Sequence, residues 1–203
     1  MHEFNLCTII RRMNDLSAEQ NGVPLEEKKE ARGFLKVFII TFACALFVRA
    51  FIAQPFVVNG DSMQKTFETN EYLVIDELSL HLRDPIRGEV VVFKSPENPS
   101  RFFIKRIIGL PGETVSVRNN TVTIKQTDGE TFVLKEPYTN TLTHGTVDRV
   151  LREKEYFVMG DNRDVSSDSR AWGPVPRNFI IGRVLFRFLP LSRMEVTPGV
   201  ATY

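Results

Sequence analysis

The sequence predicts a mainly β, antiparallel domain preceded by one N-terminal transmembrane helix. Three observations lead to this prediction. An apolar stretch of about 20 residues lies near the N-terminus, short apolar runs separated by turn residues follow Pro55, and those runs do not alternate regularly with helical patterns. A chain of 203 residues accommodates one ordinary domain and an anchor, but not two large domains.

The predicted transmembrane helix covers residues 33–53, which read GFLKVFIITFACALFVRAFIA. At about 1.5 Å per residue, this stretch is long enough to cross the hydrocarbon core of a bilayer. Lys36 and Arg49 lie towards its two ends, where long side chains reach the polar interface. A cleaved signal peptide is a weaker interpretation because the small-residue pattern Ala43-Cys44-Ala45 lies inside the apolar run. A buried core helix would need a polar face, which the stretch lacks.

Charge predicts how the chain is oriented in the cell membrane. The twenty residues after the apolar stretch contain only Lys65 among basic residues, and the positive-inside rule then predicts a cytoplasmic N-terminus. The basic residues before the stretch are Arg11, Arg12, Lys28, Lys29 and Arg32. We therefore expect a cytoplasmic tail at 1–32, a single membrane pass at 33–53 and an extracytoplasmic β-rich domain at 54–203.

Short strands are expected throughout the domain after Pro55 because β-branched and aromatic runs are bounded there by turn residues. Pro111-Gly112, Asn119-Asn120 and Asp128-Gly129 suit tight turns between such runs. The expected strands are 72–75, 89–93, 102–108, 114–118, 121–125, 131–134, 156–159 and 179–188.

Composition excludes several classes of function. The formal net charge is +1 and no long basic run occurs, so nucleic acid is not an expected partner. The two cysteines, Cys7 and Cys44, fall in the tail and in the apolar stretch, which disfavours a disulfide between them. The three histidines are not spaced with other ligands as zinc sites require, and we expect neither a metal nor a cofactor.

Two residue types in unusual places predict the chemistry. Ser62 follows the apolar stretch closely, and Lys105 lies within the apolar run that begins at Phe102. A serine hydroxyl attacks an amide only when a base takes its proton, and a neutral lysine can be that base. Its pKa must fall by about 3 for this, at a cost on the order of 4 kcal/mol that desolvation can supply. Arg106 stays charged and cannot accept a proton, although spacing alone also allows Lys105 to extend from a strand end into water.

A dense polar loop runs from Gly160 to Gly173 after another apolar run. Loops of this kind carry function when a scaffold holds their polar groups. A solvated turn or a calcium loop are the alternatives, since several side chains offer oxygen ligands, but the Glu that an EF-hand has at its twelfth position is missing.

Four blocks of the sequence together resemble the bacterial type I signal peptidases, which are membrane-anchored Ser/Lys proteases of peptidase family S26. The blocks are GDSM around Ser62, RGEVVVF from Arg87, FIKRIIGLPGE from Phe103 and GDNRDVSSDSRAWGPVP from Gly160. They occur in the family's order, and the resemblance covers nearly all of residues 33–188. It implies a signal-peptidase-like antiparallel β-domain and a serine endopeptidase that removes signal peptides from secretory preproteins at the lipid bilayer, after an Ala-X-Ala-like site.

The resemblance also implies roles for individual residues. Ser62 corresponds to the nucleophile, whose backbone N–H would hold the oxyanion, and Lys105 to the general base. Ser166 corresponds to the hydroxyl that orients the lysine. The residues expected to support the site are Asp161, Asp168 and Arg170, and those expected to line shallow substrate pockets for small side chains are Phe56, Val58, Phe103 and Ile104.

Three positions depart from the family's usual pattern. Lys65 stands where many members have Pro, Phe67 where they have Leu, and Val165 where an Asn is common. The loss of the proline removes a fixed φ angle just after the nucleophile, so the local turn geometry is not predicted. Some members also have a hydroxyl two residues before the nucleophile, where this chain has Gly60.

Two alternative functions follow from the same residues. Ser62-Met63-Gln64-Lys65 matches the Ser-x-x-Lys motif of penicillin-recognising enzymes, but the Ser-Asp-Asn and Lys-Thr-Gly elements of those enzymes are missing from the sequence. The second alternative is a catalytically inactive, membrane-anchored binding domain. The joint presence of the residues expected at the active site argues against it.

Overall fold

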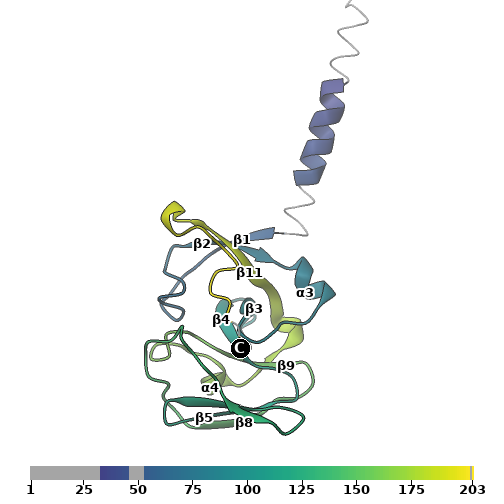
Figure 1. The fold of residues 1–203 in the computed structure, drawn as a ribbon. Coiled ribbons are helices and arrows are strands. Elements are labelled where there is room, and N and C mark those ends of the chain that lie inside the picture. The colour runs from purple at the N-terminus through teal and green to yellow at the C-terminus, as the bar shows by residue number, and fades with distance from the viewer. Residues whose placement is uncertain (1–32, 46–52, 202) are drawn as a thin grey trace, which may run out of the picture. The chain divides into compact units, whose positions relative to one another are not determined.

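The computed structural model describes residues 33–45, 53–201 and 203. The predicted tail at 1–32 and residues 46–52 of the predicted membrane span lie outside the described residues. The chain divides into two units, Met1–Phe47 and Val48–Tyr203. In the first unit, residues 33–45 form a helix (Figure 1). None of the helices in the described ranges combines the length and the apolar character that a membrane crossing requires.

Two β-sheets make up the second unit (Figure 1). The larger has eight strands in the order β1-β2-β11-β3-β4-β9-β10, with β12 paired to β11, and the smaller has four in the order β7-β6-β5-β8. The strands of the larger sheet are β1 Ala53–Val57, β2 Tyr72–Asp76, β3 Val90–Lys94, β4 Phe102–Gly109, β9 Glu155–Met159, β10 Val175–Pro176, β11 Ile180–Leu189 and β12 Glu195–Val196. Those of the smaller are β5 Thr114–Arg118, β6 Thr121–Lys125, β7 Thr131–Val133 and β8 Val147–Val150.

Short helical turns connect some of these strands, namely α3 Leu78–Leu82, α4 Ser169–Trp172, η1 Arg177–Phe179 and η2 Leu191–Arg193. Every strand pairing between described residues is antiparallel, which confirms the prediction of a mainly antiparallel β-domain.

The turn chemistry predicted from the sequence is present. Asn119 and Asn120 both have positive φ, at 48° and 62°, and they join β5 to β6 where Arg118 pairs with Thr121. A two-residue hairpin with positive φ at both positions matches the right-handed twist of the strands, and asparagine tolerates this conformation better than most residues.

Strand β4 lies in the larger sheet between β3 and β9 and contributes to all three hydrophobic clusters of the domain. Ile104 packs in the cluster that also contains Met63 and Phe67, Ile108 in the cluster beneath the smaller sheet, and Ile107 in the third. Side chains packed in three clusters hold this strand firmly, because moving it would open voids in every cluster. The strand therefore provides a rigid base for the side chains it carries.

Candidate active site

The amine of Lys105 on β4 contacts the hydroxyl of Ser62. Lys105 pairs with Val91 of β3, is only 4% exposed, and its Nζ donates a hydrogen bond of 2.6 Å to Ser62 Oγ. The same nitrogen lies 5.6 Å from the centre of the Phe103 ring. The two residues that the sequence predicts as nucleophile and base, 43 positions apart, are thus within hydrogen-bonding distance.

Burial changes the proton affinity of this amine. Desolvation lowers the pKa of Lys105 from the usual 10.5 to about 8, because a charged ammonium loses its hydration among apolar neighbours. The carboxylates of Asp168 and Asp161 act in the opposite direction and favour the charged form. Desolvation is the larger effect, so the amine gives up its proton well below the pH at which an exposed lysine does.

Ser62 lies in a helical turn that is fixed to the core by its neighbours. Phe67 N–H donates to the Met63 carbonyl at 2.8 Å, and Gln64 N–H donates to the Asp61 carbonyl at 3.1 Å. Met63 and Phe67 are fully buried. Ser62 directly precedes the first of these two apolar anchors and is half-buried, which holds its hydroxyl at the surface of the core beside the amine.

The polar loop after β9 docks directly onto this turn. Asn162 N–H donates to the Ser62 carbonyl at 3.0 Å, and Asn162 Nδ2 donates to the Asp61 carbonyl at 3.1 Å. Gly160 is needed here because a Cβ at this position would overlap Ser62 O and the Ser166 hydroxyl. The sequence predicts neither Gly160 nor Asn162 as a site residue.

Ser166 lies beside Gly160 and accepts a hydrogen bond of 3.2 Å from its N–H. Within the part of the chain that the structure describes, no hydrogen bond joins Ser166 to Lys105. The predicted role of Ser166 in orienting the amine therefore stays a prediction.

Asp168 and Arg170 form an ion pair that organises the same loop. Asp168 is fully buried, caps the N-terminus of α4, and accepts hydrogen bonds from Arg170 Nε at 2.8 Å and from Gly160 N–H at 3.1 Å. Arg170 Nη2 in turn donates to the Arg163 carbonyl at 2.8 Å. The pair ties both ends of the loop together without touching the Ser62 hydroxyl.

Asp161 has a partner that the sequence analysis did not identify. Arg106 Nε and Nη2 donate to its two carboxylate oxygens at 2.8 and 2.5 Å, and Thr66 Oγ1 donates to the second oxygen at 2.6 Å. Arg106 and Asp161 are both fully buried. Arg106 follows Lys105 directly on β4, and this adjacency was the only available signal, since nothing in the sequence indicates which buried acid it faces.

The four residues predicted to line substrate pockets do not gather in one cluster. Val58 and Ile104 are buried in the first cluster, and Phe56 packs against it. Phe103 packs against the third cluster, on the side of β4 nearer to the Lys105 amine.

The departures from the family pattern have clear structural settings. Lys65 is exposed and has a φ of 75°, a left-handed conformation that proline cannot adopt. Phe67 fills a fully buried position, and Val165 lies at the surface with 61% of its area exposed. The turn after Ser62 therefore follows a path that the usual proline would not allow.

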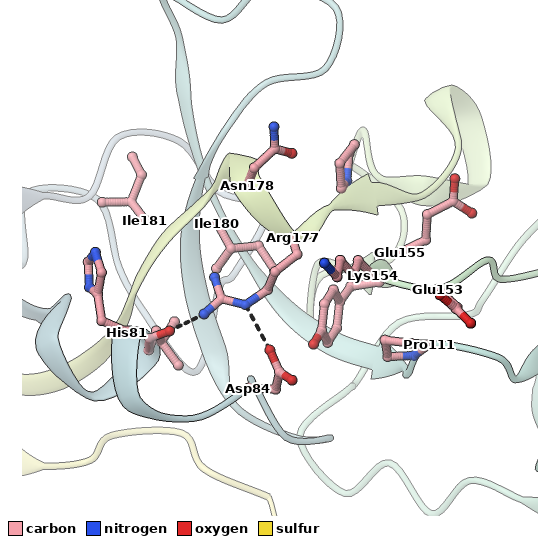
Figure 2. Close-up of a pocket in the computed structure, with 13 residues that line it drawn as sticks. His81, Asp84, Pro111, Glu153, Lys154, Glu155, Arg177, Asn178, Ile180 and Ile181 are labelled. Atoms are coloured by element: carbon pink, nitrogen blue, oxygen red, sulfur yellow. Dashed lines mark hydrogen bonds and ion pairs between the residues drawn. The ribbon is translucent and has the colours of Figure 1, made fainter.

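A large surface pocket of about 870 Å³ lies elsewhere on the domain (Figure 2). Arg177 crosses it and donates to Asp84 and to the Leu80 carbonyl. None of the predicted site residues lines this pocket. Among the charged residues that line it, Arg177 and Asp84 form an ion pair.

Comparison with known proteins assigns the chain to a family. The family model described as signal peptidase, peptidase S26, matches residues 31–189. The chain belongs to the signal peptidase family, peptidase S26. This confirms the resemblance based on the four sequence blocks. The family's activity is that of signal peptidase I, a serine endopeptidase that cleaves signal peptides, and preproteins are accordingly its substrates.

Several relatives are named for the same activity. A probable signal peptidase I-1 from Synechocystis sp. is 38% identical over 170 residues, which cover 78% of this chain and 83% of the relative. A signal peptidase IB from Staphylococcus aureus is 30% identical over 187 residues, covering 83% and 94%. The signal peptidase I from Enterococcus faecalis, known from a crystal structure, has 33% sequence identity to this chain. The match covers 50% of this chain and 97% of the crystallised chain, with a TM-score of 0.43.

Proposed function

We propose that Ser62 is the nucleophile and Lys105 the general base of this signal peptidase, and that the enzyme cuts preproteins after an Ala-X-Ala-like site. The observation that carries the proposal is the 2.6 Å hydrogen bond between a buried amine and the Ser62 hydroxyl. A general base must lie within hydrogen-bonding distance, about 2.6–3.2 Å between the two heavy atoms, of the group whose proton it removes.

The lowered pKa of Lys105 makes the amine an effective base near neutral pH. With a pKa of about 8, roughly a tenth of the amine is neutral at pH 7, whereas with the usual 10.5 only about one molecule in 3,000 would be. The gain in reactive form is on the order of 300-fold. As Ser62 Oγ bonds to the scissile carbonyl carbon, its proton passes to Lys105 Nζ. The ammonium then returns a proton to the leaving amine, and hydrolysis of the acyl-enzyme by water restores the serine.

The oxyanion of the tetrahedral intermediate would be held by the Ser62 N–H. This group donates to no backbone or side-chain oxygen among the described residues, so it is available to a substrate. Gly60 provides no hydroxyl to assist it. Backbone donors aimed at developing negative charge are worth several kcal/mol in comparable sites, of order 3 per donor.

Two further assignments follow from the resemblance to the family. Phe56, Val58, Phe103 and Ile104 would line shallow pockets that accept only small side chains at the first and third residues before the cut. Asp161, Asp168 and Arg170 would hold the loop against the turn of Ser62, and Ser166 would contact the amine when substrate orders the site.

For the placement in the cell, we propose a tail at 1–32 in the cytoplasm, a single membrane span at 33–53 and a catalytic domain at 54–203 outside. The apolar length of the span and the excess of basic residues before it support this orientation. A span at this position would deliver preproteins to Ser62 along the bilayer, because their signal peptides insert in the same layer.

The test compares three alanine variants on a preprotein with an Ala-X-Ala site. We expect Ser62→Ala and Lys105→Ala each to abolish cleavage, and Lys65→Ala to retain most of it. Sequencing the new N-terminus of the product identifies the bond that is cut. Retained cleavage in Lys105→Ala with loss in Lys65→Ala would reverse the assignment of the base, and covalent labelling of Ser62 by a fluorescent penicillin would favour the Ser-x-x-Lys interpretation.

Membrane topology has a separate test. A membrane-impermeant thiol reagent added to intact cells should not label Cys7, but should label it after the membrane is opened. Labelling of Cys7 in intact cells would reverse the proposed orientation.

A further inference from the structure

The end of the chain returns to the centre of the domain after β11. We call residues 199–201 together with Tyr203 the C-terminal latch. The latch lies beyond the region matched by the family model, which ends at residue 189. No role in the chemistry of the active site is implied for these residues by the family's sequence blocks.

Three hydrogen bonds hold the latch against the domain. The Gly199 carbonyl accepts one from Arg106 Nη1, and Ala201 N–H donates one of 3.4 Å to the Gly88 carbonyl. The hydroxyls of Tyr203 and Tyr138 lie 2.6 Å apart.

Two glycines allow the latch to approach this closely. Gly199 has a φ of 72°, and a Cβ there would overlap the Thr66 methyl group. Gly88 has a φ of 89°, and a Cβ there would overlap the Ala201 carbonyl. Any larger residue at either position would push the latch away from the domain.

The latch closes the environment of Arg106, which is fully buried. Besides Asp161, the guanidinium donates to the Gly88 carbonyl at 2.8 Å and to the Gly199 carbonyl, and it lies 3.9 Å above the Tyr138 ring. Removing Gly199 would leave a buried N–H without its acceptor, a state that proteins avoid by rearrangement or by admitting water. A cavity of about 410 Å³ lined by the latch and Tyr138 would provide the route for that water.

Arg106 connects the latch to the catalytic pair. Arg106 directly follows Lys105 on strand β4, and it donates to the carboxylate of Asp161. The next residue after Asp161 is Asn162, whose N–H donates to the Ser62 carbonyl. A shift of the guanidinium would therefore move the segment that fixes the nucleophile.

We propose that the C-terminal latch is a positioning element for catalysis, which holds the Arg106 guanidinium on Asp161 and thereby fixes residues 160–162 against Ser62. The proposal rests on the roles proposed above for Ser62 and Lys105. The latch itself touches neither of the reacting side chains.

Charge in this region predicts a second effect of losing the latch. The Asp161 carboxylate favours the charged form of Lys105, and Arg106 neutralises that carboxylate. Loosening the ion pair exposes Lys105 to more of the negative charge and raises its pKa. The titratable groups that act on Arg106 or Lys105 are Asp161, Asp168, Tyr138 and Tyr203. The ion pair of Arg163 with Glu136 lies next to Tyr138 and Asp161.

The experiment uses the full chain in detergent and three variants. The first ends at Pro198 and lacks the latch, the second is Gly199→Ala, and Val196→Ala is the control because this residue lies outside the latch and is 67% exposed. We expect the first two to remain folded, with kcat lowered at least about tenfold and KM changed less than about twofold. The acidic limb of their pH profiles should move to higher pH, whereas the control should match the parent.

Two results would overturn the proposal. One is a folded truncated chain with the kcat and pH profile of the parent. If the truncated chain does not fold, the Gly199→Ala variant is the test. A parental kcat and pH profile in that variant would likewise overturn the proposal. Failure of the proposed function would look different, since Ser62→Ala would then keep its activity in the complete chain.

Discussion

Replacing Lys105 with methionine should stabilise the protein while abolishing its activity. Lys105 is 4% exposed, and at pH 7 its amine is mostly charged in a place that disfavours charge. Methionine has a similar length and no charge, so it fills the same space without that cost. The variant separates what the lysine contributes to chemistry from what it costs the fold.

The magnitude follows from the lowered pKa. A tenfold change in proton affinity corresponds to about 1.4 kcal/mol, so lowering the pKa of Lys105 from 10.5 to about 8 reduces the free energy of unfolding at pH 7 by about 3 kcal/mol. Methionine also loses the hydrogen bond to Ser62, worth about 1 kcal/mol. We expect a net stabilisation of about 2 kcal/mol, equivalent to a rise in Tm of roughly 4–8 °C for a domain of this size.

The sign of the pH dependence is fixed by the two pKa values. The unfolded chain keeps its proton up to pH 10.5 and the folded chain releases it near 8, so unfolding takes up a proton between these values and stability rises with pH across that window. The parent should regain about 1 kcal/mol between pH 7 and 9 relative to the methionine variant.

Denaturant unfolding of both proteins at pH 7, 8 and 9 measures this difference. Lys65→Met is the matched control, since Lys65 is exposed and its replacement should leave the pH dependence of the parent intact. A Lys105→Met variant that is less stable than the parent at pH 7, or a stability difference that stays constant from pH 7 to 9, would refute the reasoning.

Three further predictions concern the same site. The kcat/KM of the parent should rise with pH through about 8, where Lys105 becomes neutral, and a profile that rises only above about pH 10 would contradict a buried base. Gly160→Ala should lower turnover at least about 100-fold, because its methyl group would displace the Ser62 carbonyl and the Ser166 hydroxyl, and parental turnover would show that this contact is not needed. Lys65→Gly should raise the free energy of unfolding by about 0.5–1 kcal/mol because it relieves a φ of 75°, whereas Lys65→Ala should not, and equal stabilities in thermal unfolding would count against strain there.

Most strands of the domain could be predicted from local pattern because both signals, apolar runs and turn residues, are contained in a few adjacent positions. The predicted runs 114–118 and 121–125 match β5 and β6 at both ends, and the turn between them has the expected conformation. Strand β8 was missed because three of its four residues are exposed, which leaves no alternation to recognise. Strand β10 has only two residues and no pattern of its own.

The active site could be predicted only in part, for a different reason. Residue chemistry and the family resemblance both identify Ser62 and Lys105 as nucleophile and base, but no spacing rule brings together atoms that are 43 residues apart. The ion pair between Arg106 and Asp161, which are 55 residues apart, depends on the order in which the strands pair in the sheet. The same is true of the contact between Gly199 and Arg106. Such pairs become visible only when the sheet order is known.

The hydrogen bonds from Asn162 to the turn of Ser62 join residues about a hundred positions apart, and this separation affects when hydrolysis can begin. During synthesis Ser62 and Lys105 leave the ribosome before the loop that contains Asn162, which fixes the turn of Ser62. A prematurely terminated polypeptide would contain both reactive groups and still lack the arrangement that makes them cut. The Ser62 turn would thus be fixed for cleavage only after the segment that contains Asn162 has been made.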